Sequence, residues 1–127
     1  MLNIFKSRKV FLIVIASGIL IFTYFSYTAY ANTGEKGRYD VTLRYLTAEK
    51  EYAEHDISNI EVSHYLSNVV LSYEPWSIAV VFKDEPNAVY YYDYNNGVIS
   101  QGGISGYTEN EIYKHFEGNG EGLDKQR

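Results

Sequence analysis

Three histidines and one pair of adjacent carboxylates are the residues of this chain best suited to metal binding or acid–base chemistry. The histidines are His55, His64 and His115. No two of them have a helical four-residue spacing or a short metal-ligand spacing, so a zinc site would need all three to converge with an acid. Asp84 and Glu85 are neighbours, and neighbours in a strand point to opposite faces, whereas turns are commonly charged. We therefore expect no metal site, and we interpret the two carboxylates as a solvated turn.

A second pattern resembles a calcium loop, because Asp93, Asn95, Asn96 and Gly97 follow each other closely. A calcium loop needs its glycine at the sixth position and a glutamate at the twelfth. Counted from Asp93, the glycine is at the fifth position, and Ile104 is at the twelfth. The sequence also contains no Walker loop, no dinucleotide fingerprint and no nucleophile elbow around a serine. We therefore expect no catalytic residue, no cofactor and no enzymatic activity.

The tyrosines are more informative, since four of the 14 in the chain lie in the stretch AVYYYDY. In a strand, Tyr90, Tyr92 and Tyr94 project to one face, and Tyr91 projects to the other. One interpretation is simple packing, because aromatic pairs stabilise a sheet. The other is a recognition surface, because tyrosine offers a wide contact at low entropic cost. The candidate partner surface consists of Trp76, Tyr90, Tyr92 and Tyr94, and its partner would be a protein or a cell-envelope component.

Alternating and turn-forming residues predict a sheet that positions these aromatic side chains. The predicted strands are Ile60–Leu66, Trp76–Lys83, Ala88–Tyr94 and Val98–Gln101. Residues 84–87 have the composition of a turn, and Asn96-Gly97 is typical of a type I′ hairpin. The segment 67–75 is ambiguous, because Val69, Val70 and Leu71 favour a strand that Pro75 would end.

Two helices are predicted around the strands. Val41, Tyr45, Ala48 and Tyr52 fall at helical spacing, which indicates an amphipathic helix over about 39–52. Thr108 to Glu111 fits a capping box and predicts a short helix over about 109–116. The expected fold class is α+β: an N-terminal transmembrane or signal helix, an amphipathic helix on a three- to four-stranded antiparallel meander, and a short C-terminal helix.

The N-terminal segment has the features of a membrane anchor. Lys6, Arg8 and Lys9 precede a stretch without charge, which is nearly all apolar from Val10 to Phe22 and extends to Ala31. As a helix, these 22 residues would measure about 33 Å, enough for a hydrocarbon core of about 30 Å. The preceding cations predict a cytoplasmic N-terminus and an extracellular C-terminal domain at the cell membrane.

A cleaved signal peptide explains the same segment. It would have a basic start, a 13-residue apolar core, and Ala29-Tyr30-Ala31 as a small-x-small cleavage site before Asn32. The released chain would then be a secreted effector, inhibitor or immunity-type protein. Both interpretations export residues 32–127. The predicted organisation is an anchor or signal peptide at 1–31, a linker at 32–37, an extracytoplasmic α+β domain at 38–117 and a disordered tail at 118–127.

Charge and composition exclude several classes of function. The chain has 11 Lys+Arg against 16 Asp+Glu, a net charge of −5. Three of the cations precede residue 32, so the exported part has 8 against 16, or −8. This acidic balance argues against a nucleic-acid partner, which needs clustered Lys and Arg. The absence of Cys excludes disulfides and a lipidated N-terminal cysteine. Together with the absence of an Asn-x-Ser/Thr glycosylation site, it favours a Gram-positive bacterium.

Several of these features occur together in one protein family. They are the apolar N-terminal span, a following helix, the strand with Ile57, Ile60, Glu61 and Val62, and the strand beginning with Trp76. Residues 83–86 (KDEP) and an aromatic strand ending in Asn-Gly complete the pattern. Over residues 1–101 the chain resembles the DUF3139 family of domains of unknown function. The resemblance implies a small single-pass membrane protein of a low-GC Gram-positive bacterium. It implies no mechanism, because the family has no established activity.

Overall fold

The computed structural model of this protein describes residues 7–118 and divides the chain into two compact units, Met1–Gly34 and Glu35–Arg127. Each unit is described by itself. The disordered tail predicted for residues 118–127 lies outside the described residues, apart from Gly118.

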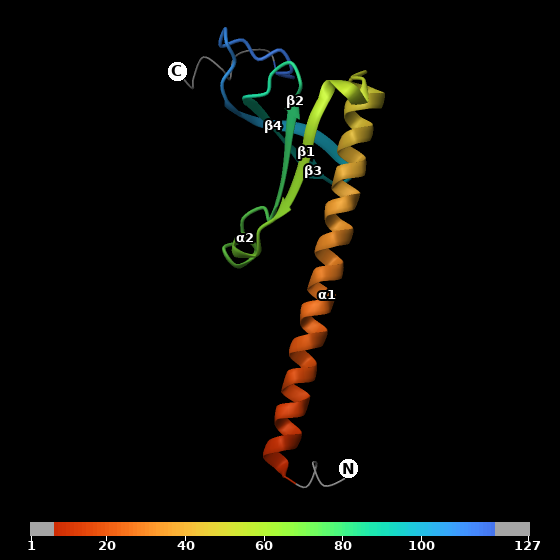
Figure 1. The fold of residues 1–127 in the computed structure, drawn as a ribbon, viewed down its shortest axis with the longest axis vertical. Helices are drawn as coiled ribbons and strands as arrows, with labels where there is room; N and C mark the ends of the chain where they lie inside the picture. Colours follow the sequence, from red (N-terminus) through yellow and green to blue (C-terminus); the bar gives the residue numbers. More distant parts are fainter. Residues whose placement is uncertain (1–6, 119–127) are drawn as a thin grey trace. The chain divides into compact units, whose positions relative to one another are not determined.

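The first unit contains most of helix α1, which spans Arg8–Arg44 (Figure 1). Among the described residues this is the one helix long and apolar enough to cross a bilayer. Its most apolar 18-residue window has a mean hydropathy of 2.2 and no buried residue. Length and composition of this kind suit a membrane span and also a signal sequence. Residues 32–37, predicted as a linker, are helical, and the boundary between the units falls among them at Gly34.

The second unit begins with the last turns of α1, which continue into a π-helical turn over Tyr45–Glu49. The Lys50 amide donates to the Tyr45 carbonyl at 3.1 Å, and the chain then leaves the helix at Glu51, which has a positive φ of 61°. The helix predicted over 39–52 therefore ends earlier than expected. The wider π turn also rotates Ala48 into solvent, whereas Leu46 is fully buried.

Four antiparallel strands follow in the order β1-β2-β3-β4 (Figure 1). Their bounds are β1 Ile57–His64, β2 Trp76–Phe82, β3 Ala88–Asn95 and β4 Val98–Gly106. This confirms the predicted meander. The β3–β4 turn has positive φ at both Asn96 (49°) and Gly97 (82°), as a type I′ turn requires. A short 3₁₀ helix, Glu54–Asp56, leads into β1, and helix α2, Leu66–Val70, lies between β1 and β2.

The core lies on the inner face of the sheet, where alternate residues of each strand are buried. The strand β2 shows this most clearly, since Trp76, Ile78, Val80 and Phe82 are all buried. The other buried apolar residues are Leu46, Ile60, Val62, Ala88, Tyr90, Tyr92 and Ile99. Leu46 shows that the helical segment of this unit contributes to the same core.

One prediction of local structure is wrong: the helix over 109–116 is absent, because these residues form turns. In the segment 67–75, which the sequence left ambiguous, Val69 and Val70 belong to α2. Glu111 has a positive φ of 55°, which a helix does not allow. The amides of Lys114 and Glu117 bond instead to side chains of Glu85 and Gln101, at 2.9 Å each. Tertiary hydrogen bonds thus replace the helical ones.

Candidate functional site

The structure corrects the predicted aromatic surface. Trp76, Tyr90 and Tyr92 are 9%, 0% and 2% exposed, so these three side chains belong to the core. Tyr94, at the end of the same strand face, is half-buried. The inner face of an antiparallel sheet is the face that a helix covers, and this unit places the alternating aromatic residues on it. For the first three residues the packing interpretation therefore holds.

Each buried tyrosine hydroxyl has a hydrogen-bond partner. The Tyr90 hydroxyl donates to the buried Glu85 carboxylate, and the Tyr92 hydroxyl donates to Glu117 Oε1 at 3.0 Å. The Tyr45 hydroxyl donates to Glu117 Oε2 at 2.7 Å. Burial, with the neighbouring carboxylates, raises the pKa of Tyr45, Tyr90 and Tyr92 well above its ordinary value. Glu117 thereby joins the C-terminal segment to β3 through Tyr92 and to the helical segment through Tyr45.

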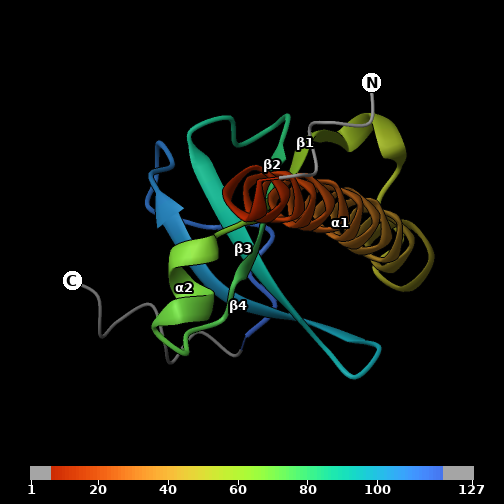
Figure 2. The same cartoon turned by 90° about the horizontal axis from the view of Figure 1, so that it is seen from below.

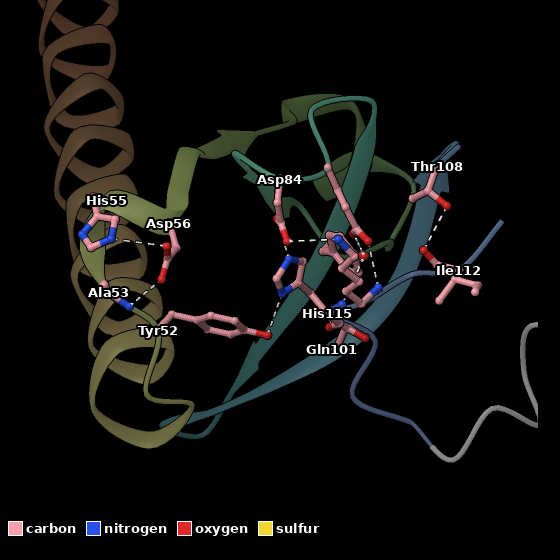
Figure 3. A network of polar contacts seen from close by, with 12 residues as sticks. Tyr52, Ala53, His55, Asp56, Asp84, Gln101, Thr108, Ile112 and His115 are labelled. Atoms are coloured by element: carbon pink, nitrogen blue, oxygen red, sulfur yellow. Dashed lines mark hydrogen bonds and ion pairs between the residues drawn. The ribbon is translucent and has the colours of Figure 1, made fainter. Parts of the chain in front are cut away.

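The three histidines have different surroundings. His115 has Nδ1 2.9 Å from the Tyr52 hydroxyl and Nε2 2.7 Å from Asp84 Oδ1, as Figure 3 shows, and its ring stacks on Phe82 at 3.8 Å. His55 is exposed beside Asp56 (Figure 3), and the ring of His64 lies 4.5 Å from that of Trp76. Within residues 7–118 no group of three or more histidines and carboxylates lies close enough to hold a metal ion.

The contacts that run from Asp84 through His115 to Tyr52 join the residue types that a proton relay uses. Burial and the neighbouring carboxylates raise the pKa of Tyr52, which therefore keeps its proton at neutral pH. The imidazole ring is stacked on Phe82, with its side chain 11% exposed. The contacts end on the Tyr52 phenol, which is protonated and half-buried. This arrangement favours a role in packing.

A groove opens where β2 and β3 diverge. Their register covers three residue pairs, from Val80↔Tyr90 to Ile78↔Tyr92. Beyond these pairs β2 continues beside β1, through His64↔Trp76, while β3 continues beside β4, through Tyr94↔Ile99. In Figure 2 the β3–β4 hairpin consequently points away from α2.

The groove has a volume of about 470 Å³ and combines aromatic with charged side chains. The Arg38 guanidinium lies 4.0 Å from the centroid of the Trp76 ring and 5.5 Å from that of Tyr94, both within cation–π range. The acidic residues Glu74 and Asp93 also belong to its lining. The full lining is Arg38, Glu74, Trp76, Ile78, Tyr92, Asp93, Tyr94, Asn95 and Ser100.

Three of the four residues predicted as a partner surface, Trp76, Tyr92 and Tyr94, thus line this groove, although Trp76 and Tyr92 are buried beneath its surface. Sequence reasoning missed Arg38 and Glu74. Arg38 lies three residues before Val41 and just before the predicted helix, so its spacing from the apolar residues of that helix was the available signal. Glu74 had no comparable signal, because it lies in the ambiguous segment before Trp76.

The architecture defines a class of small α+β proteins in which a long apolar N-terminal helix precedes a four-stranded antiparallel meander. Residues 5–92 match the sequence model of a family described as "Protein of unknown function (DUF3139)". This is more than half of the chain, and the chain belongs to the DUF3139 family, as the resemblance indicated. No curated protein and no solved structure matches it. The match ends within β3, so β4 and the segment 113–117 lie beyond it.

Proposed function

We propose that this protein is a single-pass membrane protein whose extracytoplasmic domain, residues 38–117, acts by binding and not by catalysis. The observation that carries the proposal is the uncharged helical segment from Val10 to Ala31, which follows the three cations Lys6, Arg8 and Lys9. Its apolar side chains are exposed from Val10 to Phe25. Apolar surface of this extent is stable in lipid, and the flanking charges favour an inside N-terminus.

The groove between β2 and β3 is the proposed binding site. The half-buried Tyr94 ring offers apolar surface, while Arg38 offers a charged donor. A protein segment or a cell-envelope component that carries both apolar faces and polar groups is the partner that this lining fits.

A specific sequence feature supports a second candidate function. Ala29 and Ala31 form a small-x-small site, and cleavage after Ala31 would release the domain as a small secreted effector, inhibitor or immunity-type protein. The groove would then act on a soluble or surface-bound partner.

Fractionation of cells that carry a C-terminally tagged chain separates the two candidates. The anchored protein stays in the membrane fraction at full length, and external protease removes its tag. A matched variant, Ala31→Phe, blocks cleavage and leaves an anchored protein unchanged. A mature chain that begins at Asn32 in the medium, absent for the variant, contradicts the anchor and supports the secreted form.

Crosslinking in intact cells tests the groove. Arg38→Ala and Tyr94→Ala should each reduce the yield of captured partner by about tenfold, the equivalent of about 1.4 kcal/mol of binding free energy. Tyr91→Ala is the control, because Tyr91 is exposed on the opposite face of the same strand. If folded groove variants capture the same partners as the unchanged chain, the groove is not the binding site.

A further inference from the structure

The loop between β1 and β2 exposes an unusual concentration of apolar side chains. Residues 65–73 read YLSNVVLSY and contain no charge, although the exported part of the chain carries −8. Six of the nine side chains are large and apolar or aromatic, and each is between 49% and 79% exposed. They are Tyr65, Leu66, Val69, Val70, Leu71 and Tyr73. Clustered exposure of this kind marks an interaction surface.

The loop is held in shape by its own polar groups. The Tyr65 amide donates to the Pro75 carbonyl at 2.7 Å, which closes the base of the loop. The Asn68 side chain donates to the Glu74 carbonyl at 2.9 Å, and the Asn68 carbonyl accepts from the Tyr73 amide at 2.9 Å. Polar groups are thus bonded inside the loop and apolar groups point outward, so the exposed tip is an ordered protrusion.

The loop lies at the end of the domain that the chain enters from the apolar segment. It leads directly into Trp76, whose ring is 4.0 Å from the Arg38 guanidinium. Arg38 comes seven residues after Ala31, the last residue of the proposed span. Seven residues cover at most about 25 Å when fully extended, and about 10 Å when helical. The covalent chain therefore keeps this end of the domain close to any bilayer that holds the span.

We propose that the loop Tyr65–Tyr73 inserts its apolar tip into the lipid–water interface of the membrane that anchors the chain. This inference rests on the proposed anchor and adds a second, peripheral contact that orients the groove. Val69, Val70 and Leu71 enter the edge of the hydrocarbon region. Tyr65 and Tyr73 lie at its two ends, and tyrosine favours the headgroup level, where its ring is apolar and its hydroxyl is hydrated.

Lipid suits this surface better than a protein partner does. The tip is a convex protrusion of nine residues, whereas a stable protein interface needs about 800 Å² of complementary surface on each side. A bilayer needs no shape complementarity. It also disfavours the acidic remainder of the domain, which makes an uncharged loop the surface best able to approach it.

Depth-dependent quenching in proteoliposomes tests the proposal on the full-length chain. The protein has no Cys, so a single cysteine carries an environment-sensitive dye at one chosen site. Val70→Cys labels the tip. Val98→Cys is the matched control, because Val98 is also strongly exposed and lies on the β3–β4 hairpin. Ile21→Cys labels the apolar segment and reports the anchor independently. The vesicles are phosphatidylcholine with a fraction of nitroxide-labelled lipid.

The expected result is blue-shifted emission and lipid quenching at positions 70 and 21, and neither at position 98. Adding Leu71→Asp to the Val70→Cys chain should abolish the quenching at position 70. Quenching at 21 without quenching at 70 overturns the loop proposal and leaves the anchor standing. Absence of quenching at 21 overturns the anchor as well.

Two other outcomes also decide against the proposal. A blue shift at position 70 without lipid quenching means that protein covers the tip, either a second copy or another partner. Equal quenching at 70 and 98 means that the domain lies on the bilayer without using the loop specifically.

Discussion

The two ends of β2 reverse the usual distribution of side chains in opposite ways. At the end that follows Phe82, polar groups are inside: Glu85 is 5% exposed, and His115 and Glu117 are half-buried among tyrosines. At the end that precedes Trp76, apolar groups are outside, and Val70 is 79% exposed. The seven residues of the strand separate these ends by about 20 Å.

This difference shows how each end is stabilised. The polar end is stable because every buried hydroxyl and carboxylate described above has a partner, and an unpaired one would carry a desolvation cost. The exposed apolar side chains at the other end contribute no hydrophobic stabilisation while water surrounds them. They do so only when another surface covers them. The polar end is therefore a feature of folding, and the apolar end is a feature of interaction.

Alkaline pH should have the largest effect, because it acts on four tyrosines of the polar end together. The pKa of Tyr45, Tyr52, Tyr90 and Tyr92 is raised in the folded state, mainly by burial. Their stabilisation is fully present below the unfolded value of about 10 and is lost as the pH rises above it, because the unfolded chain then releases protons that the folded chain retains. Above about pH 10, the part of the tyrosinate absorbance that comes from these four residues, measured as the difference from their Phe variants, should change together with the circular dichroism. Ionisation of these four residues without loss of structure would contradict this account.

Glu85→Ala should be the most damaging single change at neutral pH. It removes the partner of the buried Tyr90 hydroxyl and of the Lys114 amide. We expect a loss of about 3 kcal/mol in the free energy of unfolding, measured by chemical denaturation. Glu109→Ala, at an exposed site, should change it by less than about 0.5 kcal/mol. Equal effects of the two variants would mean that the polar end is not a stabilising network.

Tyr92→Phe measures one hydroxyl of that network with little change in packing. The hydroxyl donates to Glu117 and accepts from Gln101. We expect a loss of about 1 kcal/mol and a shallower decline of stability in alkali. Tyr91→Phe is the control, because that exposed hydroxyl contacts only Ser105 among the hydrogen bonds described, at 3.3 Å. A loss as large for Tyr91→Phe would remove the distinction between the two faces of β3.

Val70→Ala should have the smallest effect. It is compared with Val80→Ala, which removes the same methyl groups from a fully buried position of β2, whereas Val70 lies on the exposed loop. Val80→Ala should lose about 2 kcal/mol of folding free energy, and Val70→Ala less than about 0.5 kcal/mol, in thermal or chemical unfolding. A large loss for Val70→Ala would show that the loop stabilises the fold, and would contradict the proposed difference between the two ends of β2.

Local signals were sufficient for most of the sheet. The alternation in WSIAVVFK and AVYYYDY predicts β2 and β3 within one residue, because the side-chain period of a strand is written directly in the sequence. Asn96-Gly97 predicts the hairpin because few other residue pairs adopt positive φ twice. The apolar N-terminal helix follows from composition alone.

Three features depended on contacts between distant residues. The capping-box pattern at Thr108 predicts a helix, but the amides that would have formed it bond to side chains of Glu85 and Gln101. The groove depends on where β2 and β3 separate, which no local pattern encodes. The face that the helical segment covers decided that Tyr90 and Tyr92 are core residues.

The apolar segment, the strands and the turns at 84–87 and 96–97 could be predicted from short-range periodicity and backbone preferences, and the family from the motifs within these elements. Which aromatic residues are buried, which polar groups are paired and which apolar loop is exposed could be learned from the three-dimensional structure alone. The reason is physical: burial and pairing depend on the neighbours that a residue meets in space, and those neighbours lie up to 72 positions away, as Tyr45 and Glu117 do.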